Sequence, residues 1–421
     1  MSSATIAAAR LPSVTRARVM GFVFLALGVA AAWWFGLGAE PGTSSTFGLN
    51  GRTAAIRLPE LVLPTRASAL FLAAVCAFLG GMQLARGFGR RTYLVLGVVV
   101  SCFVMAFLIW AARGGSLNLL GMLQSTLLRA VPITLGALAG VLCERAAVIN
   151  IAIEGMMLTA AFVGSIVGSA SGSLIVGMVA GVLSGALLGA LLAVLSIRYR
   201  VDQIIAGTVI NIFALGITSY LSARIFSEYQ SLNNPGRFSV IDIPLLSDIP
   251  VIGPIFFSNN IFIYLMFVLI VVVHVGLYRT RWGLRVRAVG EHPRAADTVG
   301  IKVLATRYRN VILGGMIAGL AGAYFTLGSV GRFDENMTGG RGFIALAAMI
   351  FGHWNPLGAF GAALVFGFAD SLQNKLAILD VGIPSEFLLM APYLATILAV
   401  AGVVGRARPP AADGQPYIKE D

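Results

Sequence analysis

Charge is what this sequence has least of. Only 11% of its 421 residues are charged and 58% are hydrophobic, whereas a typical soluble domain is roughly 25% charged. So few charges among long apolar runs exclude an ordinary soluble domain and predict an all-α polytopic membrane protein. The charges are also unequal, with 30 Lys and Arg against 18 Asp and Glu. This excess fits membrane topology and anionic lipid headgroups, and we expect no nucleic-acid partner.

Cysteine and histidine are equally scarce, with three of each. Cys76, Cys102 and Cys143 lie in apolar runs without CxxC or Cys/His spacing, so neither a disulfide framework nor a metal site is expected. The sequence has no GxxxxGK[ST] phosphate loop and no GxSxG elbow. His274 has no partner at ligand spacing, and no catalytic constellation can be assembled. We therefore expect a chain that is not an enzyme, with no catalytic residues and no cofactor of its own.

The basic loop 279–309 orients the chain. It lies between the apolar runs 261–278 and 311–330 and carries eight Lys and Arg against Glu291 and Asp297. Short loops rich in Lys and Arg stay in the cytoplasm. Within this loop, His292-Pro293 can begin a short helix and Gly300 can end it in a left-handed conformation. Such a helix could be gripped by another protein, although charge alone also fits a solvated loop that only fixes topology.

About ten crossings follow from the apolar runs, with both termini cytoplasmic because Arg10, Arg16, Arg406 and Arg408 flank the first and last spans. An N-terminal region, 1–115, contains spans 19–37, 67–85 and 93–112 and an outer loop 39–65. A core, 116–405, follows, and 406–421 is a cytoplasmic tail. Its plain spans are predicted at 174–197, 201–221, 261–278, 311–330 and 387–404. Glycines at spacing four in the first of these predict close helix packing: Gly177, Gly181, Gly185 and Gly189.

Residues 116–158 do not form a plain span. The mixed stretch 116–128 predicts a helix at the outer interface, with Arg129 at headgroup level. The following run 130–143 is then a short crossing that continues into a polar segment, and 158–167 completes the next crossing, outward. There, Asn150 and Glu154 are four residues apart and would share a helical face, next to Gly155. An ionisable residue in an apolar segment suggests a broken helix that lines a transport pathway, although bonds between helices would explain it equally well.

A second interruption lies at His353-Trp354-Asn355-Pro356. Apolar pieces 342–352 and 358–369 flank it. Because an even number of crossings is required between two cytoplasmic termini, we interpret 342–369 as a re-entrant pair of half-helices and 387–404 as the last span. If 342–369 crossed outright, the tail would be outside.

Five stretches together resemble the permease subunits of bacterial ATP-binding-cassette importers in the ribose and branched-chain amino-acid branch. Among these the chain is most similar to nucleoside permeases linked to basic membrane proteins. The stretches are 148–155, with Asn150 and Glu154; 202–211, beginning Asp202-Gln203; 249–254; 287–301; and 336–356. They span about 120 to 375, and the N-terminal region and the tail match less specifically. The resemblance implies a type II importer-like fold.

The same resemblance implies partners and a coupling site. It implies an ATPase subunit that binds ATP-Mg, a second homologous permease, an extracytoplasmic substrate-binding lipoprotein and a small-molecule substrate. The loop helix would dock into the ATPase through Gly290, Glu291, Ala295, Ala296 and Gly300. Closure of the ATPase on ATP would then drive alternating access. Ribose-type sugars and branched-chain amino acids remain alternative substrates. An ion-coupled secondary transporter, working without a nucleotide-binding partner, remains a different class.

Our candidates for lining the translocation pathway are the polar residues of the two interruptions and of span 201–221: Asn150, Glu154, Asn211, His353 and Asn355. Two hypotheses follow. Glu154→Gln should reduce transport and leave assembly intact, and unchanged uptake would make Glu154 structural at most. Glu291→Arg should weaken docking of the ATPase, and normal co-purification would argue against the coupling role.

Overall fold

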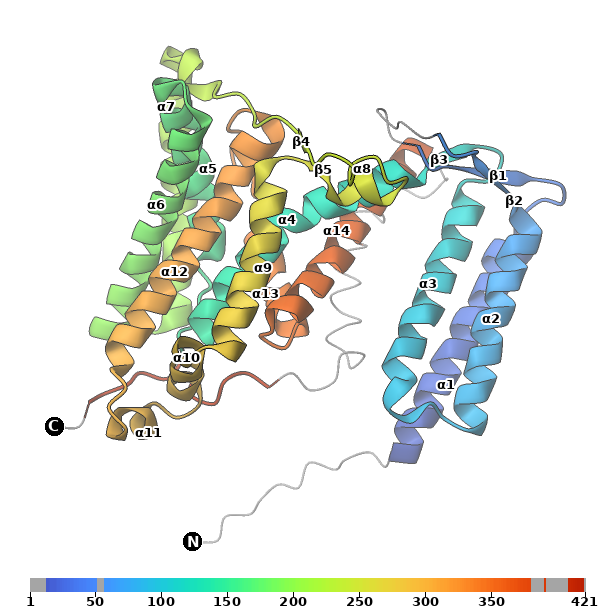
Figure 1. The fold of residues 1–421 in the computed structure, drawn as a ribbon, viewed down its shortest axis with the longest axis horizontal. Helices are drawn as coiled ribbons and strands as arrows, with labels where there is room; N and C mark the ends of the chain where they lie inside the picture. Colours follow the sequence, from blue (N-terminus) through green and yellow to red (C-terminus); the bar gives the residue numbers. More distant parts are fainter. Residues whose placement is uncertain (1–12, 51–56, 380–389, 391–407, 420–421) are drawn as a thin grey trace, which may run out of the picture. The chain divides into compact units, whose positions relative to one another are not determined.

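The computed structural model describes residues 13–50, 57–379, 390 and 408–419. The chain divides into two compact units. Unit 1 comprises Met1–Gly121 with Leu376–Ile383, and unit 2 comprises Met122–Lys375 with Pro384–Asp421. Each unit is a bundle of helices, drawn in sequence colours in Figure 1.

Unit 1 contains the three helices that the N-terminal apolar runs predict. They are α1 (Ser13–Ala30), which continues as a π-helix η1 (Ala31–Leu37), α2 (Thr65–Ala85) and α3 (Thr92–Ala111). The predicted outer loop contains strands that sequence reasoning missed, β1 (Ser44–Gly48) and β2 (Leu61–Pro64). β1 lies between antiparallel β2 and parallel β3 (Ser116–Asn118) in a three-stranded sheet.

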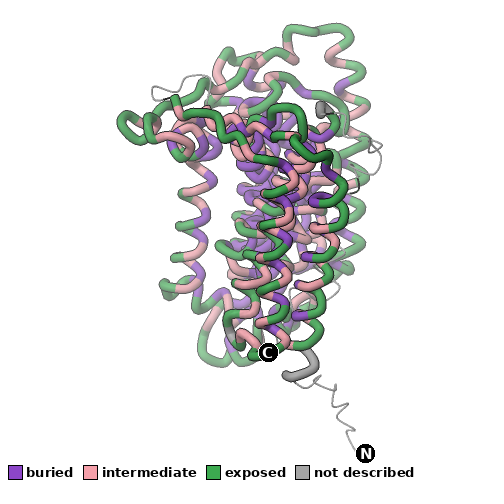
Figure 2. Tube along the Cα trace, turned by 90° about the vertical axis from the view of Figure 1, so that its right-hand side faces the viewer, coloured by how far each residue is buried: buried purple, intermediate pink, exposed green. Residues whose placement is uncertain are grey.

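Unit 2 is organised around α4 (Leu119–Glu144) and α12 (Val303–Ala323). In the most apolar part of α4 89% of residues are buried, against 28% for α7. Figure 2 shows buried residues on the inward faces of the helices. The remaining elements are α5 (Ile153–Ser171), α6 (Leu174–Ala193), η3 (Val194–Arg198), α7 (Gln203–Glu228), η4 (Gln230–Asn233), β4 (Ile241–Asp242), α8 (Ile252–Phe256), β5 (Ser258–Asn259), α9 (Ile261–Arg279), α10 (Arg281–Glu291), α11 (Pro293–Thr298), η5 (Tyr324–Val330), α13 (Arg341–Phe351) and α14 (Pro356–Leu379).

The glycine stripe on α6 packs as predicted. A Cβ atom on Gly185 would lie 2.4 Å from the carbonyl oxygen of Gly315, and one on Gly315 would lie 2.5 Å from the carbonyl oxygen of Gly185. The two glycines therefore let the α6 and α12 backbones approach each other directly. Such contacts are how helices associate where lipid removes the hydrophobic driving force between them.

Nine helices in the described part of the chain are long and apolar enough to cross a membrane. They coincide with the first nine of the predicted spans. The tenth, 387–404, lies outside the described residues. The second of the two predicted pieces, 358–369, is longer than expected, because α14 runs from Pro356 to Leu379 and has 24 residues, whereas α13 has 11.

The division of residues 116–143 is wrong. α4 is one continuous helix of 26 residues, with Pro132 inside it. The polar residues that suggested an interfacial helix are accounted for by tertiary partners. The Gln124 amide donates to the Pro254 carbonyl over 3.0 Å, and Arg129 forms an ion pair with Asp370. A polar side chain with a protein partner does not need the headgroup layer.

Candidate functional site

The predicted break in the spans lies between α4 and α5, at residues 145–152. Ala147 adopts a left-handed conformation with φ 63°, and helix resumes only at Ile153. Asn150 therefore precedes the helix and does not share a helical face with Glu154, which corrects that expectation. The non-helical stretch leaves backbone groups that must be bonded elsewhere.

Two side chains of α7 form hydrogen bonds with backbone groups in and beside this non-helical stretch. The Ile149 N–H donates to Gln203 Oε1 over 2.6 Å. Asn211 accepts from the Gly155 N–H at 2.7 Å and donates to the Ile151 carbonyl at 2.8 Å. Both α7 residues belong to the stretch 202–211 that carries the family resemblance. Gln203 and Asn211 thus bond the stretch between α4 and α5, and the first turn of α5, to the neighbouring helix α7.

Glu154 joins α5 to the beginning of α13. Its Oε1 accepts from the Thr338 hydroxyl at 2.6 Å and the Gly340 N–H at 2.8 Å, and its Oε2 accepts from the Gly342 N–H at 2.6 Å. The residue is buried. A carboxylate at this position satisfies N–H groups that the first turn of a helix cannot bond internally. Glu154 therefore clamps two discontinuous helices together.

A second clamp joins the end of α4 to the turn between α13 and α14. Trp354 donates its indole N–H to Glu144 Oε2 at 2.5 Å. Arg145 donates to the Trp354 carbonyl at 3.0 Å and to the His353 carbonyl at 3.2 Å. His353 and Trp354 both have positive φ, 54° and 52°. The turn at His353 and Trp354, called the corner below, is therefore hydrogen-bonded to Glu144 and Arg145, where the break begins.

The five predicted pathway residues lie in three settings. Glu154 and Asn211 meet around Gly155, as described above. Asn150 is fully buried and donates to Cys143 Sγ at 3.4 Å. At the corner, His353 is exposed and Asn355 accepts from the Leu357 N–H at 2.9 Å, as an N-cap of α14. The structure does not bring the five together, and among the described residues the side chains of all but His353 have a hydrogen-bond partner.

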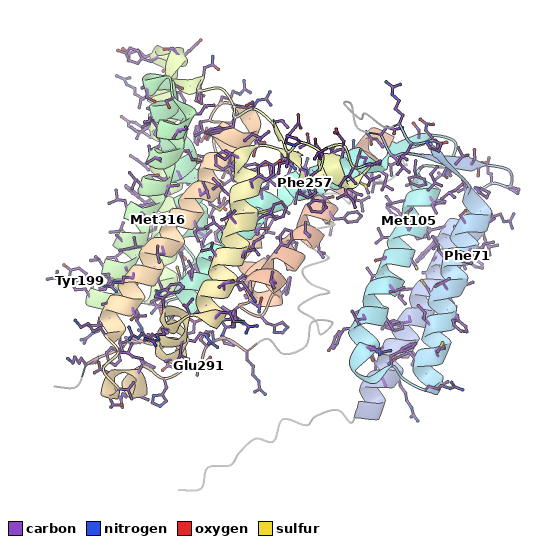
Figure 3. All side chains as sticks on the ribbon, viewed as in Figure 1. Phe71, Met105, Tyr199, Phe257, Glu291 and Met316 are labelled. Atoms are coloured by element: carbon purple, nitrogen blue, oxygen red, sulfur yellow. The ribbon has the colours of Figure 1, made fainter. Side chains whose placement is uncertain are left out.

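The basic loop folds into α10 and α11 at one end of unit 2, where Figure 3 labels Glu291. The short predicted helix is confirmed as α11. His292 Nδ1 accepts from the Ala295 N–H at 3.2 Å at its beginning. At its end Gly300 has φ 82° and the Ile301 N–H bonds the Ala296 carbonyl at 3.0 Å, the pattern of a glycine-terminated helix. The sequence did not predict α10.

Burial divides the five predicted coupling residues. Glu291, Ala295 and Gly300 are exposed. Gly290 and Ala296 are buried, and a Cβ on Gly290 would lie 2.3 Å from the Arg145 carbonyl oxygen. Gly290 and Ala296 are therefore not accessible to a partner protein; they pack the basic loop against the rest of unit 2. Arg145 thus touches both α10 and the corner at Trp354.

The C-terminal tail 408–419 packs on this loop, which the sequence did not predict. The Ala412 N–H donates to the Gly290 carbonyl at 2.9 Å, and the Ala411 N–H donates to Glu291 Oε2 at 3.3 Å. Arg307, only 2% exposed, donates to the Gln415 carbonyl at 2.9 Å. Tyr417 is buried against Val289, Ala296 and Val303. The tail therefore stabilises the position of α10 and α11.

One acidic residue of the tail lies among buried charges. Burial raises the pKa of Asp413 to about 6, although Glu144, the Gly414 backbone and the Arg307 guanidinium oppose this rise. Removal from water disfavours the charged carboxylate more than these neighbours favour it. Proton binding at Asp413 is consequently linked to docking of the tail.

The nine long apolar helices of the described residues define a multi-pass membrane protein. The family described as "Branched-chain amino acid transport system / permease component" matches residues 122–404, and the chain belongs to that family. The match begins one residue after the end of the N-terminal part of unit 1. As a permease component, the chain is a membrane-embedded transport subunit and not an enzyme.

Within this family, the chain is similar to permeases of nucleoside ABC transporters. The chain is 42% identical to the guanosine ABC transporter permease protein NupQ of Bacillus subtilis over 304 residues, 70% of this chain and 95% of the relative. It is 38% identical to the nucleoside ABC transporter permease protein NupC of Lactococcus lactis, over 70% of this chain and 95% of that one. A second Bacillus subtilis guanosine permease, NupP, is 25% identical over 84% of this chain and 98% of its own length. No solved structure matches.

Proposed function

We propose that this chain is the nucleoside-translocating permease of an ATP-driven importer in a bacterial cytoplasmic membrane, with both termini in the cytoplasm. It would work with a separate ATPase, a second homologous permease and an extracytoplasmic binding lipoprotein. The nucleoside assignment rests on the similarity to NupQ and NupC. The second permease is supported by the similarity to NupP, since two guanosine permeases of one organism resemble this chain.

The single observation that carries the coupling role is the seating of the basic loop. An exposed helix, α11, follows exposed Glu291, while buried Gly290 contacts the backbone at Arg145. Arg145 in turn holds the corner at Trp354. A force applied to α10 and α11 from the cytoplasm would therefore reach both the break and the corner through direct contacts, as a rigid lever requires.

Glu154 and Asn211 would serve this mechanism as clamps that keep the half-helices in register while the bundle moves. Asn150 would fix the inner packing, and His353 and Asn355 would shape the corner. The surface contact with the ATPase would come from Glu291, Ala295 and Gly300, with Gly290 and Ala296 supporting them from below.

The test is purification of the tagged chain with its native partners, followed by reconstitution into liposomes. We expect a P-loop ATPase and a second permease to co-purify, and ATP to drive uptake of labelled guanosine in the presence of the binding protein. Excess ribose, glucose or leucine should not compete. Competition by one of these would reassign the substrate. Uptake by the solitary chain without ATP would indicate an ion-coupled carrier instead.

A further inference from the structure

Three charged side chains meet within the helices of unit 2, apart from both clamps. Arg129 Nη1 of α4 lies 3.2 Å from Asp370 Oδ2 of α14, and Arg341 Nη2 of α13 lies 3.5 Å from the same oxygen. We call these residues the Arg–Asp–Arg triad. Three separate elements contribute to it, so only the tertiary fold creates it.

Two members of the triad lie inside long helices, and the third is the first residue of a short one. Arg129 is ten residues into α4, about 15 Å from its beginning, and Asp370 is fourteen residues into α14, about 21 Å from its beginning. Arg341 begins α13, directly beside the Gly340 and Gly342 N–H groups that Glu154 holds. Arg129 is also only five residues beyond Gln124, which bonds Pro254 of the 224–260 loop, so the triad lies toward that end of unit 2, beside the beginning of α13. Discontinuous helices of this kind form the substrate sites of transporters.

The side chains of the triad are partly exposed, unlike those of a fully buried ion pair. The side chains of Arg129, Arg341 and Asp370 are 31%, 28% and 22% exposed. Charged side chains within membrane-spanning helices rarely face hydrocarbon and instead face a protein interior or water. A partly exposed triad in a membrane span therefore indicates that this face of unit 2 borders an aqueous passage.

The hydrogen bonds of the triad leave donors for a ligand. Among the described residues, Arg129 uses only Nη1 toward Asp370. Arg341 uses Nη1 toward the Thr338 carbonyl and Nη2 toward Asp370. The Arg341 guanidinium also lies 5.7 Å from the Phe325 ring centre, which fixes its plane. Two guanidinium groups and one carboxylate carry a net positive charge and present planar N–H donors.

We propose that the Arg–Asp–Arg triad lines the translocation passage and contacts the passing solute, a neutral molecule rich in hydrogen-bond acceptors. Resting on the proposed function, this solute is a nucleoside, whose base carbonyl, ring nitrogen and ribose hydroxyls accept from arginine. Guanidinium groups bond a purine's O6 and N7 in this way. Asp370 prevents the two arginines from holding the solute, or an anion, too tightly.

The first experiment measures whether the triad faces water. Asn374 is exposed, one helical turn beyond Asp370, and donates to the Asp370 carbonyl. Asn374→Cys, in the whole reconstituted transporter, is treated with a charged, membrane-impermeant methanethiosulfonate. We expect rapid labelling that guanosine slows severalfold. Both this protein and the control without the added cysteine carry Cys102→Ser, because Cys102 is only partly buried whereas Cys76 and Cys143 are buried. Absence of labelling would show a lipid or protein-covered face and overturn the proposal.

The second experiment measures transport. Arg129→Met should lower guanosine uptake at least tenfold and raise the KM, Arg129→Lys should retain more uptake, and ATPase co-purification should stay normal. The matched control is the double variant Arg332→Met with Asp334→Asn, which removes an exposed ion pair outside the triad and should transport normally. Normal uptake by Arg129→Met would overturn the contact with solute. Absence of nucleoside uptake by the unmodified transporter would instead reject the proposed function, and labelling of Asn374→Cys would still decide whether the triad borders water.

Discussion

Units 1 and 2 both contain aromatic contacts and close glycine backbones, yet in unit 2 buried polar groups also join broken helices. In unit 1 large side chains fill the space: Phe35 contacts Phe103, Phe107 and Trp110 at ring-centre distances of 5.4, 5.5 and 5.7 Å. In unit 2 glycine backbones touch directly and buried polar groups join broken helices. Flexible side chains can adjust to a substitution, whereas backbone contacts and fixed hydrogen bonds cannot.

This difference matches the extent of the family. The permease-component family covers 122–404, which lies within unit 2 apart from the short C-terminal segment of unit 1. The clamps and the glycine contacts between α6 and α12 thus lie within the residues that match the permease family. Substitutions at the clamps and glycine contacts of unit 2 are expected to abolish transport, and substitutions at the aromatic contacts of unit 1 are expected to leave it largely intact.

The largest effect is expected from Glu154→Ala. It leaves the Thr338 hydroxyl and the Gly340 and Gly342 N–H groups buried without their acceptor, at a cost of about 3–5 kcal/mol. We expect transport to be lost and the midpoint of thermal unfolding in detergent to fall. Glu154→Gln keeps one acceptor oxygen and should lie between this variant and the unchanged protein. Equal uptake by all three would show that the clamp has no function.

A second large effect is expected from Gly185→Leu, because its side chain would meet the Gly315 carbonyl in α12. Overpacking against backbone costs about 3 kcal/mol or more, so little assembled transporter should be recovered. The matched variant in unit 1 is Gly81→Leu, where a Cβ meets nothing within 4 Å. Size-exclusion chromatography of the two proteins makes the comparison. Normal assembly of Gly185→Leu would mean that α6 and α12 can separate without penalty.

A moderate effect is expected from Glu291→Arg. Reversing an exposed charge on the docking loop should reduce recovery of the ATPase about tenfold, equivalent to about 1.4 kcal/mol. The Ala411 N–H also loses its acceptor in this variant, so Glu291→Gln, which retains an oxygen, separates the two effects. Glu335→Arg makes the same change at another exposed position outside the loop and should bind the ATPase normally. Undiminished co-purification of Glu291→Arg would refute the docking role.

A smaller effect is expected from pH. Because burial raises the pKa of Asp413 to about 6, the docked tail binds protons more strongly than a free tail does. Docking should be strongest below the ordinary aspartate pKa of about 4 and weaken as pH rises through 6. A fluorophore on Lys419→Cys should report increasing tail mobility between pH 4.5 and 7.5. Asp413→Asn, which cannot ionise, should flatten this dependence, and an unchanged slope would assign it to another group.

The smallest effect on transport is expected in unit 1. Phe35→Leu removes three ring contacts and should lower stability by about 1–3 kcal/mol. Guanosine uptake per assembled transporter should nevertheless stay within about twofold, since the described residues of unit 1 contain no clamp of the kind seen at Glu154. A loss of uptake as large as that of Glu154→Ala would erase the distinction between the units.

Local sequence patterns predicted much of the scaffold. Apolar runs located nine spans, the spacing of Gly181 and Gly185 predicted a close helix contact, and His292-Pro293 with Gly300 predicted the bounds of α11 closely. Each of these signals acts over a few residues. The same reasoning did not find the ion pair of Arg129 with Asp370, because a local pattern contains no information on a partner far along the chain.

The sequence by itself therefore determined the class, the positions of most spans, the break near Asn150 and the basic loop, since hydropathy, glycine spacing and charge act locally along the chain. Only the tertiary structure decided what the polar residues do. Glu154 meets Thr338 from 184 residues away, Arg129 meets Asp370 from 241, and the tail meets Glu291 from 120. No periodicity records such pairs, because a buried charge specifies that it needs a partner but not where along the chain that partner lies.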